Sequence, residues 1–258
     1  MSALPSSPDD PRLAGWYHTI ELGNGLVSKG HFDHRPVVGR YGIPRSLEGK
    51  TALDVGTGDG FFAFEMEKRG ADRVVAVDVA RVGDCDWVPR MRSRIGALDD
   101  VQSWPDHFRL AHAMRRSRVE YQYCSVYDLS PYTVGMFDVV FCGSLLVHLQ
   151  NPLLALQRIR SVTRDMAVIE TAVDEHGETL LPGRPVMSFG APGLETEPGE
   201  SNTFWLYSTA ALCRMLEYAD FPVTVPQGVF LLPPAGPKGT SVVAYPRAHG
   251  PMRPDAGS

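Results

Sequence analysis

Short apolar runs alternate with amphipathic segments through the central part of the chain. The runs with the pattern of buried strands lie at 51–55, 73–78, 119–124, 137–142, 165–171, 223–230 and 240–245. Helical spacing of apolar residues predicts helices near 59–69, 87–97, 106–116, 152–162 and 208–219. Strands that alternate with helices predict an α/β fold with a mostly parallel sheet. The proline-rich connection at 233–237 predicts that the last two strands form an antiparallel hairpin.

Four segments lie outside this alternating pattern. Residues 1–12 and 247–258 are rich in Pro, Gly and charge, and we expect flexible tails there. Residues 13–47 form an N-terminal cap before the main domain at 48–246, and 174–204 form a long loop within that domain. Ligands of open α/β sheets bind at the carboxyl ends of the strands, so we expect cap and loop to act as lids. Ordinary surface insertions are the alternative.

Composition narrows the class of protein. The 258 residues carry a formal charge of −5, so no overall basic field attracts nucleic acid or anionic membranes. No apolar run reaches the roughly 18 residues of a membrane span, and the first residues lack the apolar core of a secretory signal. The four cysteines are far apart and form no metal or disulfide pattern. We therefore expect a cytoplasmic protein that does not contact membranes.

The strongest local signal is a glycine-rich turn after the first core strand. It runs from Asp54 to Gly60, and Asp78 ends the next strand. Glycines let the backbone approach a ligand, and a carboxylate at Asp78 is suited to binding a ribose. A dinucleotide site would place a third glycine where Phe61 stands, and Asp59 would repel a pyrophosphate. Asp59 suits the cationic amino group of a methionine moiety instead.

This turn resembles motif I of the class I S-adenosylmethionine-dependent methyltransferases. The resemblance implies S-adenosylmethionine as cofactor and a seven-stranded Rossmann-like sheet of order 3-2-1-4-5-7-6. At the third strand, the acid that usually contacts adenine is replaced by the hydroxyl of Ser125. The cofactor residues that the resemblance implies are Asp54, Gly56, Thr57, Gly58, Asp59, Asp78, Val79, Ser125, Val126, Gly143 and Ser144.

A wider resemblance extends over about residues 16–245. The chain is similar to the tRNA wobble-uridine methyltransferase-like family, which includes 5-methoxyuridine- and carboxymethyluridine-forming enzymes and many small-molecule relatives. The segments that carry it are 16–22, 47–50, 145–153, 170–171 and 202–205. Val147 stands where tRNA-acting members usually have Tyr, which favours a small-molecule branch. The basic cluster of Arg115, Arg116 and Arg118 has the pattern of a solvated helix face rather than an RNA contact.

Candidate catalytic residues lie after the fourth and fifth core strands. His148 is the first candidate for a general base, because histidine titrates near neutrality. A structural histidine that binds the turn backbone is the alternative. Glu170 ends the fifth strand and could orient a substrate or act as base, or it could cap the following loop.

The cap supplies the candidate acceptor site. Trp16, Tyr17, His18 and Glu21 could wall a pocket for a flat or sugar-like substrate, and packing on the core is the alternative. His18, Glu21, His31, Asp33 and His34 also suggest a metal site, but their spacing fits no familiar ligand pattern, so we expect no metal.

Together these features predict an S-adenosylmethionine-dependent methyltransferase that acts on a small molecule, by O-methylation in a biosynthetic pathway. A tRNA wobble-uridine methyltransferase is the first alternative, with tRNA as partner. A non-catalytic cofactor-binding regulator is the second, and His148 and Glu170 argue against it. The acceptor and the oligomeric state do not follow from the sequence.

Overall fold

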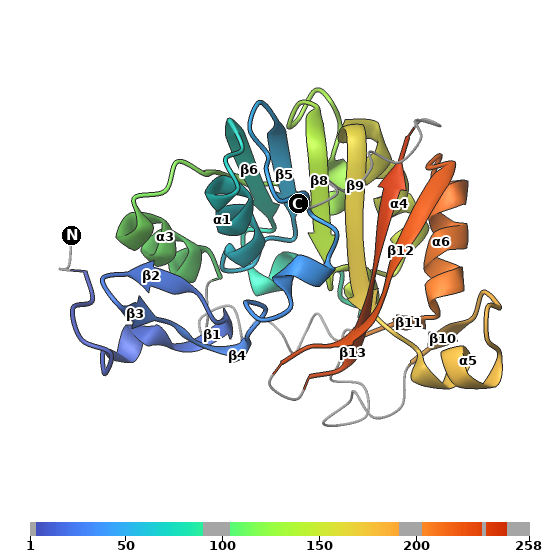
Figure 1. Ribbon diagram of the computed structural model, residues 1–258, viewed down its shortest axis with the longest axis horizontal. Coiled ribbons are helices and arrows are strands. Elements are labelled where there is room, and N and C mark those ends of the chain that lie inside the picture. Colours follow the sequence, from blue (N-terminus) through green and yellow to red (C-terminus); the bar gives the residue numbers. More distant parts are fainter. Residues whose placement is uncertain (1–3, 90–103, 191–202, 234–235, 247–258) are drawn as a thin grey trace, which may run out of the picture.

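The computed structural model describes residues 4–89, 104–190, 203–233 and 236–246. A seven-stranded sheet forms the centre, with helices against both faces (Figure 1). The strands are β1 (Ala14–His18), β2 (Glu21–Gly23), β3 (Leu26–Val27), β4 (Lys29–Phe32), β5 (Thr51–Val55), β6 (Arg73–Asp78), β7 (Glu120–Tyr123), β8 (Phe137–Gly143), β9 (Thr163–Ala172), β10 (Met187–Phe189), β11 (Trp205–Tyr207), β12 (Val223–Leu231) and β13 (Lys238–Tyr245). The helices are α1 (Phe61–Lys68), α3 (Trp104–Arg115), α4 (Pro152–Val162), α5 (Glu175–Leu180) and α6 (Thr209–Tyr218).

The order of strands in the large sheet is β12-β13-β9-β8-β5-β6-β7. Strand β5 pairs in parallel with β6 and β8, while β13 is antiparallel to both β9 and β12. Counted along the chain and read from β7, this is the order 3-2-1-4-5-7-6. The predicted fold class, the seven core strands and the terminal hairpin are therefore confirmed, with strand ends shifted by at most a few residues.

The core strands bury side chains on both faces, and successive residues enter different cores. In β5, Ala52 belongs to the cluster under α1 and α3, whereas Leu53 belongs to the cluster under α4 and α6. The same alternation separates Val139 from Val140 in β8. Because both faces are covered, these strands read as continuous apolar runs, which is why the sequence located them well.

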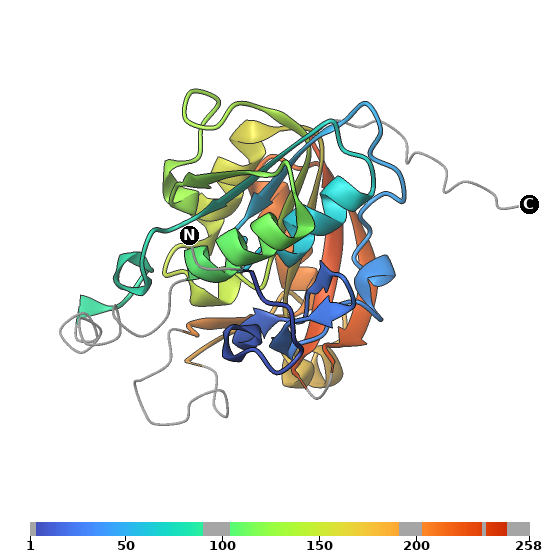
Figure 2. The same ribbon diagram turned by 90° about the vertical axis from the view of Figure 1, so that its left-hand side faces the viewer.

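The N-terminal cap consists of short strands, which the sequence did not predict. Strand β1 pairs in parallel with β4, and β2 and β3 form a hairpin around Asn24 and Gly25, both of which have positive φ. Figure 2 shows these strands below α3, on the side of the sheet where the carboxyl ends of the parallel strands lie. Trp16 holds the cap there, because its buried ring stacks on His107 of α3 at 4.6 Å.

The segment from 174 to 204, expected as a lid loop, contains regular structure in its described parts. Asp174 caps α5 by accepting a hydrogen bond from the Gly177 amide at 2.9 Å, and β10 pairs with β11. Both elements lie near the carboxyl ends of the strands (Figure 1). The lid role of this segment stays a prediction, as does that of the cap.

Four predicted helices are present, and most of the one expected at 87–97 lies outside the described residues. The expected tail at 247–258 lies outside them as well. Residues 4–12 of the other expected tail are described, and they include the buried Pro5 and the start of a short 3-10 helix at Pro11–Leu13. Among the helices that the structure describes, none has the length and apolar character needed to cross a bilayer.

Candidate active site

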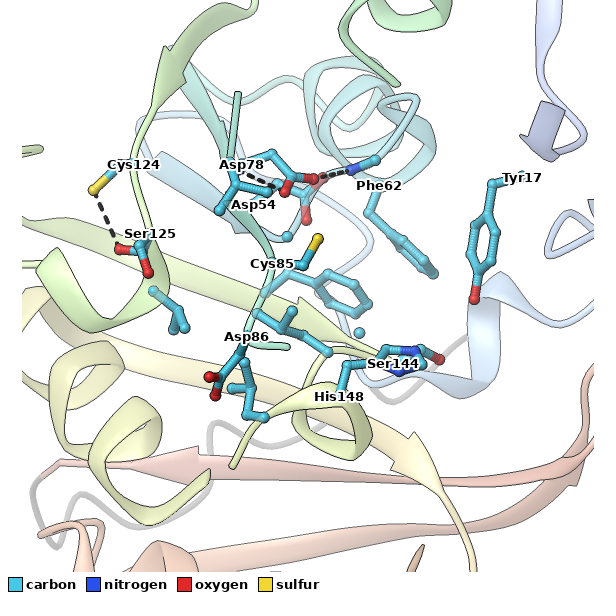
Figure 3. Close-up of a pocket in the computed structure, with 18 of the residues that line it drawn as sticks. Tyr17, Asp54, Phe62, Asp78, Cys85, Asp86, Cys124, Ser125, Ser144 and His148 are labelled. Atoms are coloured by element: carbon cyan, nitrogen blue, oxygen red, sulfur yellow. Dashed lines mark hydrogen bonds between the residues drawn. The ribbon is translucent and has the colours of Figure 1, made fainter. Parts of the chain in front are cut away.

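A cavity of about 480 Å³ lies where the carboxyl ends of the central strands meet the cap. Its wall comes from the cap, the glycine turn, the end of β6, residues 84–86 and the segments that follow β7 and β8. In Figure 3, Cys124 and Ser125 lie at one side of this cavity and Tyr17 lies at the other. The volume falls within the roughly 300–1,000 Å³ range of small-molecule and cofactor sites.

The glycine turn lines this cavity with backbone. Gly56, Gly58 and Gly60 have φ values of +74°, +57° and +97°, which L side chains rarely adopt. Gly56 and Gly58 face the cavity. Gly60 serves packing instead, since a Cβ there would lie 2.6 Å from the Phe64 ring and 2.7 Å from the Phe108 ring. The turn therefore forms a cradle that side chains would fill.

Two carboxyl groups flank the turn. Asp54 accepts hydrogen bonds from Thr57 Oγ1 at 2.6 Å and from the Ala63 amide at 3.0 Å, and burial raises its pKa to about 7. Asp78 accepts from the Gly58 amide at 2.8 Å and from the Val79 amide at 2.7 Å. Burial raises the pKa of Asp78 to about 6. Both residues line the cavity, whereas Thr57 lies behind Asp54 and only supports it.

The segment after β7 forms another part of the wall. Ser125 and Val126 line the cavity together with Val79. The Ser125 hydroxyl accepts a hydrogen bond from the Tyr127 amide at 3.3 Å and so caps the turn Val126–Asp128. Asp86, which sequence reasoning missed, reaches this wall and accepts a hydrogen bond from Tyr127 Oη at 2.6 Å.

Gly143 and Ser144 line the cavity at the end of β8. Ser144 has a φ of +50°, an uncommon conformation for a residue with a side chain. Glu170 holds it there, because Oε2 accepts from the Ser144 amide and from Ser144 Oγ, each at 2.9 Å. Strained backbone of this kind clusters at functional sites.

Glu170 lies behind this wall rather than in it. Its side chain is fully buried, and within the described part of the chain Oε1 has no hydrogen-bond partner. Burial raises the pKa of Glu170 to about 7. The expected catalytic position is thus replaced by a supporting one, since the carboxylate bonds Ser144 of the cavity wall and does not itself line the cavity.

The sequence-predicted base does line the cavity. His148 is half-buried in the turn Leu146–His148, and its amide donates a hydrogen bond to the Leu145 carbonyl at 3.0 Å. The turn directly precedes α4, whose first residue is Pro152 and whose cap is Asn151. The start of the helix thereby places the imidazole at the ends of the central strands.

The cap residues divide between wall and core. Tyr17 and His18 line the cavity, and burial raises the pKa of the Tyr17 phenol above its usual range. Trp16 and Glu21 were also expected in the wall. Trp16 is instead fully buried against α3, and its indole nitrogen donates a hydrogen bond to the Arg12 carbonyl at 2.8 Å. Glu21 is exposed and lies 3.6 Å from the Arg35 guanidinium. These two placements correct the expected acceptor pocket.

Asp59 also has a different position from the expected one. Its fully buried carboxylate turns away from the cavity toward the cap and accepts hydrogen bonds from the amides of Tyr17 and His18, each at 2.9 Å. It also bonds the His18 ring at Nδ1. The carboxylate that the sequence had suggested as a partner for a methionine amino group is thus hydrogen-bonded to the cap.

Sequence reasoning missed three aromatic residues of the wall. His34, Phe62 and Phe141 face the cavity, and the rings of Phe62 and Phe141 stack with centroids 4.0 Å apart. Burial lowers the pKa of His34 to about 3. The position of Phe62 in the first turn of α1, directly after the glycine turn, was the available signal. The sequence had drawn attention to His34 only as part of a metal pattern, not as a residue of the cavity wall.

Within the described residues, no group of three or more His, Cys, Asp or Glu side chains is arranged to hold a metal ion. The expectation that no metal takes part stays a prediction. Of the residues that had suggested a metal site, His31 and Glu21 are exposed, whereas His18 and His34 are buried.

Comparison with known proteins identifies a domain in the middle of the chain. A family model described as a methyltransferase domain matches residues 53–169. The chain is 27% identical over 182 residues to a tRNA U34 carboxymethyltransferase of Dichelobacter nodosus (strain VCS1703A), which covers 69% of this chain and 47% of that protein. It is 31% identical over 107 residues to a ubiquinone biosynthesis O-methyltransferase of Acinetobacter baumannii (strain AYE), covering 41% of this chain and 36% of that protein.

These alignments span about half or less of the curated relatives' own length. Among solved structures, the N-terminal domain of EvdMO1 in the presence of SAH and D-fucose is similar, with a TM-score of 0.56 and 19% identity. The match covers 91% of this chain and 93% of that one, so the similarity of fold extends beyond residues 53–169.

Proposed function

We propose that this chain, which carries a class I S-adenosylmethionine-dependent methyltransferase domain, transfers a methyl group to a hydroxyl group of a small molecule. The observation that carries the proposal is the cradle of Gly56 and Gly58, which opens into a cavity that also contains Asp78 and an aromatic wall. Backbone at the turn, a carboxylate beyond it and enclosed space fit a nucleoside cofactor together with a compact acceptor.

The residues of the cavity divide into cofactor and acceptor regions. We assign the amino-acid end of the cofactor to the glycine turn with Gly143 and Ser144, the ribose to Asp78, and the adenine to Val79, Ser125 and Val126. S-adenosylmethionine carries a methyl group on a sulfonium sulfur, and an oriented nucleophile can accept this methyl group directly. The protein's contribution is then orientation and the exclusion of water.

The acceptor region is the part of the cavity nearest Tyr17. Phe62 and Phe141 supply apolar ring faces there, and Tyr17 and His34 add polar edges. Such a wall suits a compact ring compound that carries hydroxyl groups. The similar EvdMO1 domain was solved with D-fucose, and one curated relative is named an O-methyltransferase, which agrees with a hydroxyl acceptor.

Calorimetric titration with S-adenosylhomocysteine tests the proposal. We expect the wild type to bind with micromolar affinity and Asp78→Ala to bind at least tenfold more weakly, because a buried carboxylate of the cavity is lost. Asp165→Ala is the matched control, since this exposed residue pairs with Lys50 at 2.8 Å and does not line the cavity. Absence of binding to the wild type, or equal affinity in Asp78→Ala, would contradict the proposal.

One observation favours a second candidate. Several curated relatives are named tRNA U34 carboxymethyltransferases, and the alignment with the Dichelobacter protein is longer than that with the O-methyltransferase. A tRNA wobble-uridine methyltransferase is therefore the alternative. It requires a phosphate-binding surface around the cavity, and binding of tRNA distinguishes the two candidates.

A further inference from the structure

Asp59 and His18 form a buried pair beside the cavity. The sequence had assigned them to different ligands, Asp59 to the cofactor and His18 to the acceptor. In the structure, Oδ2 of Asp59 accepts hydrogen bonds from the Tyr17 and His18 amides at 2.9 Å, and Oδ1 bonds Nδ1 of the His18 ring. One fully buried carboxylate therefore holds both the backbone and the imidazole of His18.

This contact determines which ring nitrogen carries hydrogen. A carboxylate that accepts two backbone N–H groups is an acceptor, so Nδ1 of His18 is the donor in the ring contact. In the neutral imidazole the other nitrogen, Nε2, then keeps its lone pair. His18 is 6% exposed and lines the cavity, and the Cβ position of Gly58 lies 3.8 Å from its Cε1 atom. The pair thus has the base-and-orienter arrangement of general-base catalysis.

The surroundings of His18 restrict water and charge. Its ring lies 4.7 Å from Tyr17, 5.1 Å from His34 and 5.7 Å from Phe61, measured between centroids. The titratable groups that face it are Asp59 from the glycine turn, Tyr17 from β1 and His34 after β4, and its charge also acts on Asp54 and Glu170. Burial holds Tyr17 protonated and His34 uncharged near neutral pH, so neither carries a charge beside the His18 ring.

We propose that His18 is the general base of the transfer and that Asp59 is its positioning residue, which makes the acceptor a hydroxyl compound. This rests on the proposed methyltransferase function. The acceptor oxygen forms a bond to the methyl carbon, the bond from that carbon to sulfur breaks with its electron pair left on sulfur, and the hydroxyl proton passes to Nε2 of His18. The imidazolium that forms is stabilised by Asp59.

The assignment competes with His148, the base predicted from the sequence, which lines the same cavity. The structure favours His18 because its ring is bonded to a fully buried carboxylate that also fixes its backbone. A third role for His18, as a ligand of the cofactor's carboxylate, would show as a loss of cofactor affinity rather than of turnover.

The state of the ring is tested by nuclear magnetic resonance of ¹⁵N-histidine-labelled protein, with and without S-adenosylhomocysteine. We expect one histidine, identified by its absence in His18→Gln, to carry hydrogen on Nδ1 and a lone pair on Nε2. Asp59→Asn should change this tautomer, whereas His31→Gln, an exposed residue on β4, should leave it unchanged. Hydrogen on Nε2 of neutral His18 would overturn the proposal, and this readout needs no acceptor.

The role in turnover is tested with S-adenosylmethionine and a panel of monosaccharides, including D-fucose, and simple phenols. With the acceptor that is methylated fastest, His18→Gln should lower kcat about 10²-fold or more, while the Kd for S-adenosylhomocysteine changes less than about twofold. Melting curves show that each variant is folded.

The outcomes separate the two proposals. Failure of the wild type to bind S-adenosylhomocysteine contradicts the proposed function, whatever the tautomer of His18. Binding without methylation of any hydroxyl compound overturns the assignment of the acceptor class and with it the base. Unchanged kcat in His18→Gln, or a loss of cofactor affinity that accounts for the whole effect, overturns the role of His18 alone.

Discussion

Glu170 is a buried carboxyl group whose titration affects the stability of the fold. Its pKa rises from 4.5 to about 7 through burial. When the pKa of a carboxyl group is higher in the folded than in the unfolded state, its contribution to the free energy of unfolding is fully present below the unfolded pKa. That contribution is lost as the pH rises through the folded pKa. Between about pH 4.5 and 7 the wild type should therefore lose on the order of 3 kcal/mol of stability from this residue.

The variant Glu170→Gln removes this titration. We expect the melting temperature of Glu170→Gln to rise relative to that of the wild type between pH 5 and pH 8, when both proteins are measured without ligand. Glu48→Gln, a change at an exposed glutamate, should follow the wild type at every pH. A difference that stays constant with pH would show that Glu170 does not titrate in this range.

At the residue scale, the sequence located those side chains whose role follows from a local motif. Gly56, Gly58 and Asp78 lie in the cavity wall because the turn and the strand end determine where they point. Asp59 belongs to the same motif, yet its carboxylate faces β1, a segment 41 residues earlier in the chain. No local pattern carries information about such a contact.

Gly30 decides whether the two main cap strands can pair. A Cβ at this position would overlap the carbonyl group of His18 and the amide nitrogen of Thr19, and backbone atoms cannot move aside as a flexible side chain can. Gly30→Ala should therefore separate β4 from β1 and displace His18. We expect faster hydrogen exchange at the Thr19 amide, which donates to the Phe32 carbonyl at 2.8 Å, and a lower melting temperature.

Gly39→Ala provides the control for this change. A Cβ at Gly39 meets no atom within 4 Å, and we expect exchange at Thr19 to remain as in the wild type. If Gly30→Ala also leaves that exchange unchanged, the parallel pairing of β1 and β4 is not what holds the cap.

At the scale of elements, long buried strands were predictable and short cap strands were not. Strands β5 and β6 have the predicted bounds, because a continuous apolar run between turn signals is a strong pattern. Strands β2 and β3 have three and two residues, too few for an alternating pattern to be recognised. Their pairing depends on a turn around Asn24 and Gly25 and on contact with α3.

The charge of the whole molecule bears on the choice between a small molecule and tRNA. The chain carries −5 overall. Arg115, from the basic cluster at 115–118, donates a hydrogen bond to the Glu21 carbonyl of the cap and lies over the Phe64 ring of α1. We therefore expect no binding of bulk tRNA at protein concentrations up to about 10 µM in 50 mM salt, measured by fluorescence anisotropy. Binding that weakens steeply with added salt would support the tRNA alternative instead.

The sequence alone determined the sheet, its strand order through family resemblance, and the type of methyl donor. These features depend on apolar periodicity and on a glycine turn, which are properties of contiguous residues. Only the tertiary structure decided that Trp16 is core, that Glu170 supports Ser144, and that Asp59 holds His18. Each of these depends on contacts between segments far apart in the chain, where burial and hydrogen bonding select partners that no local pattern encodes.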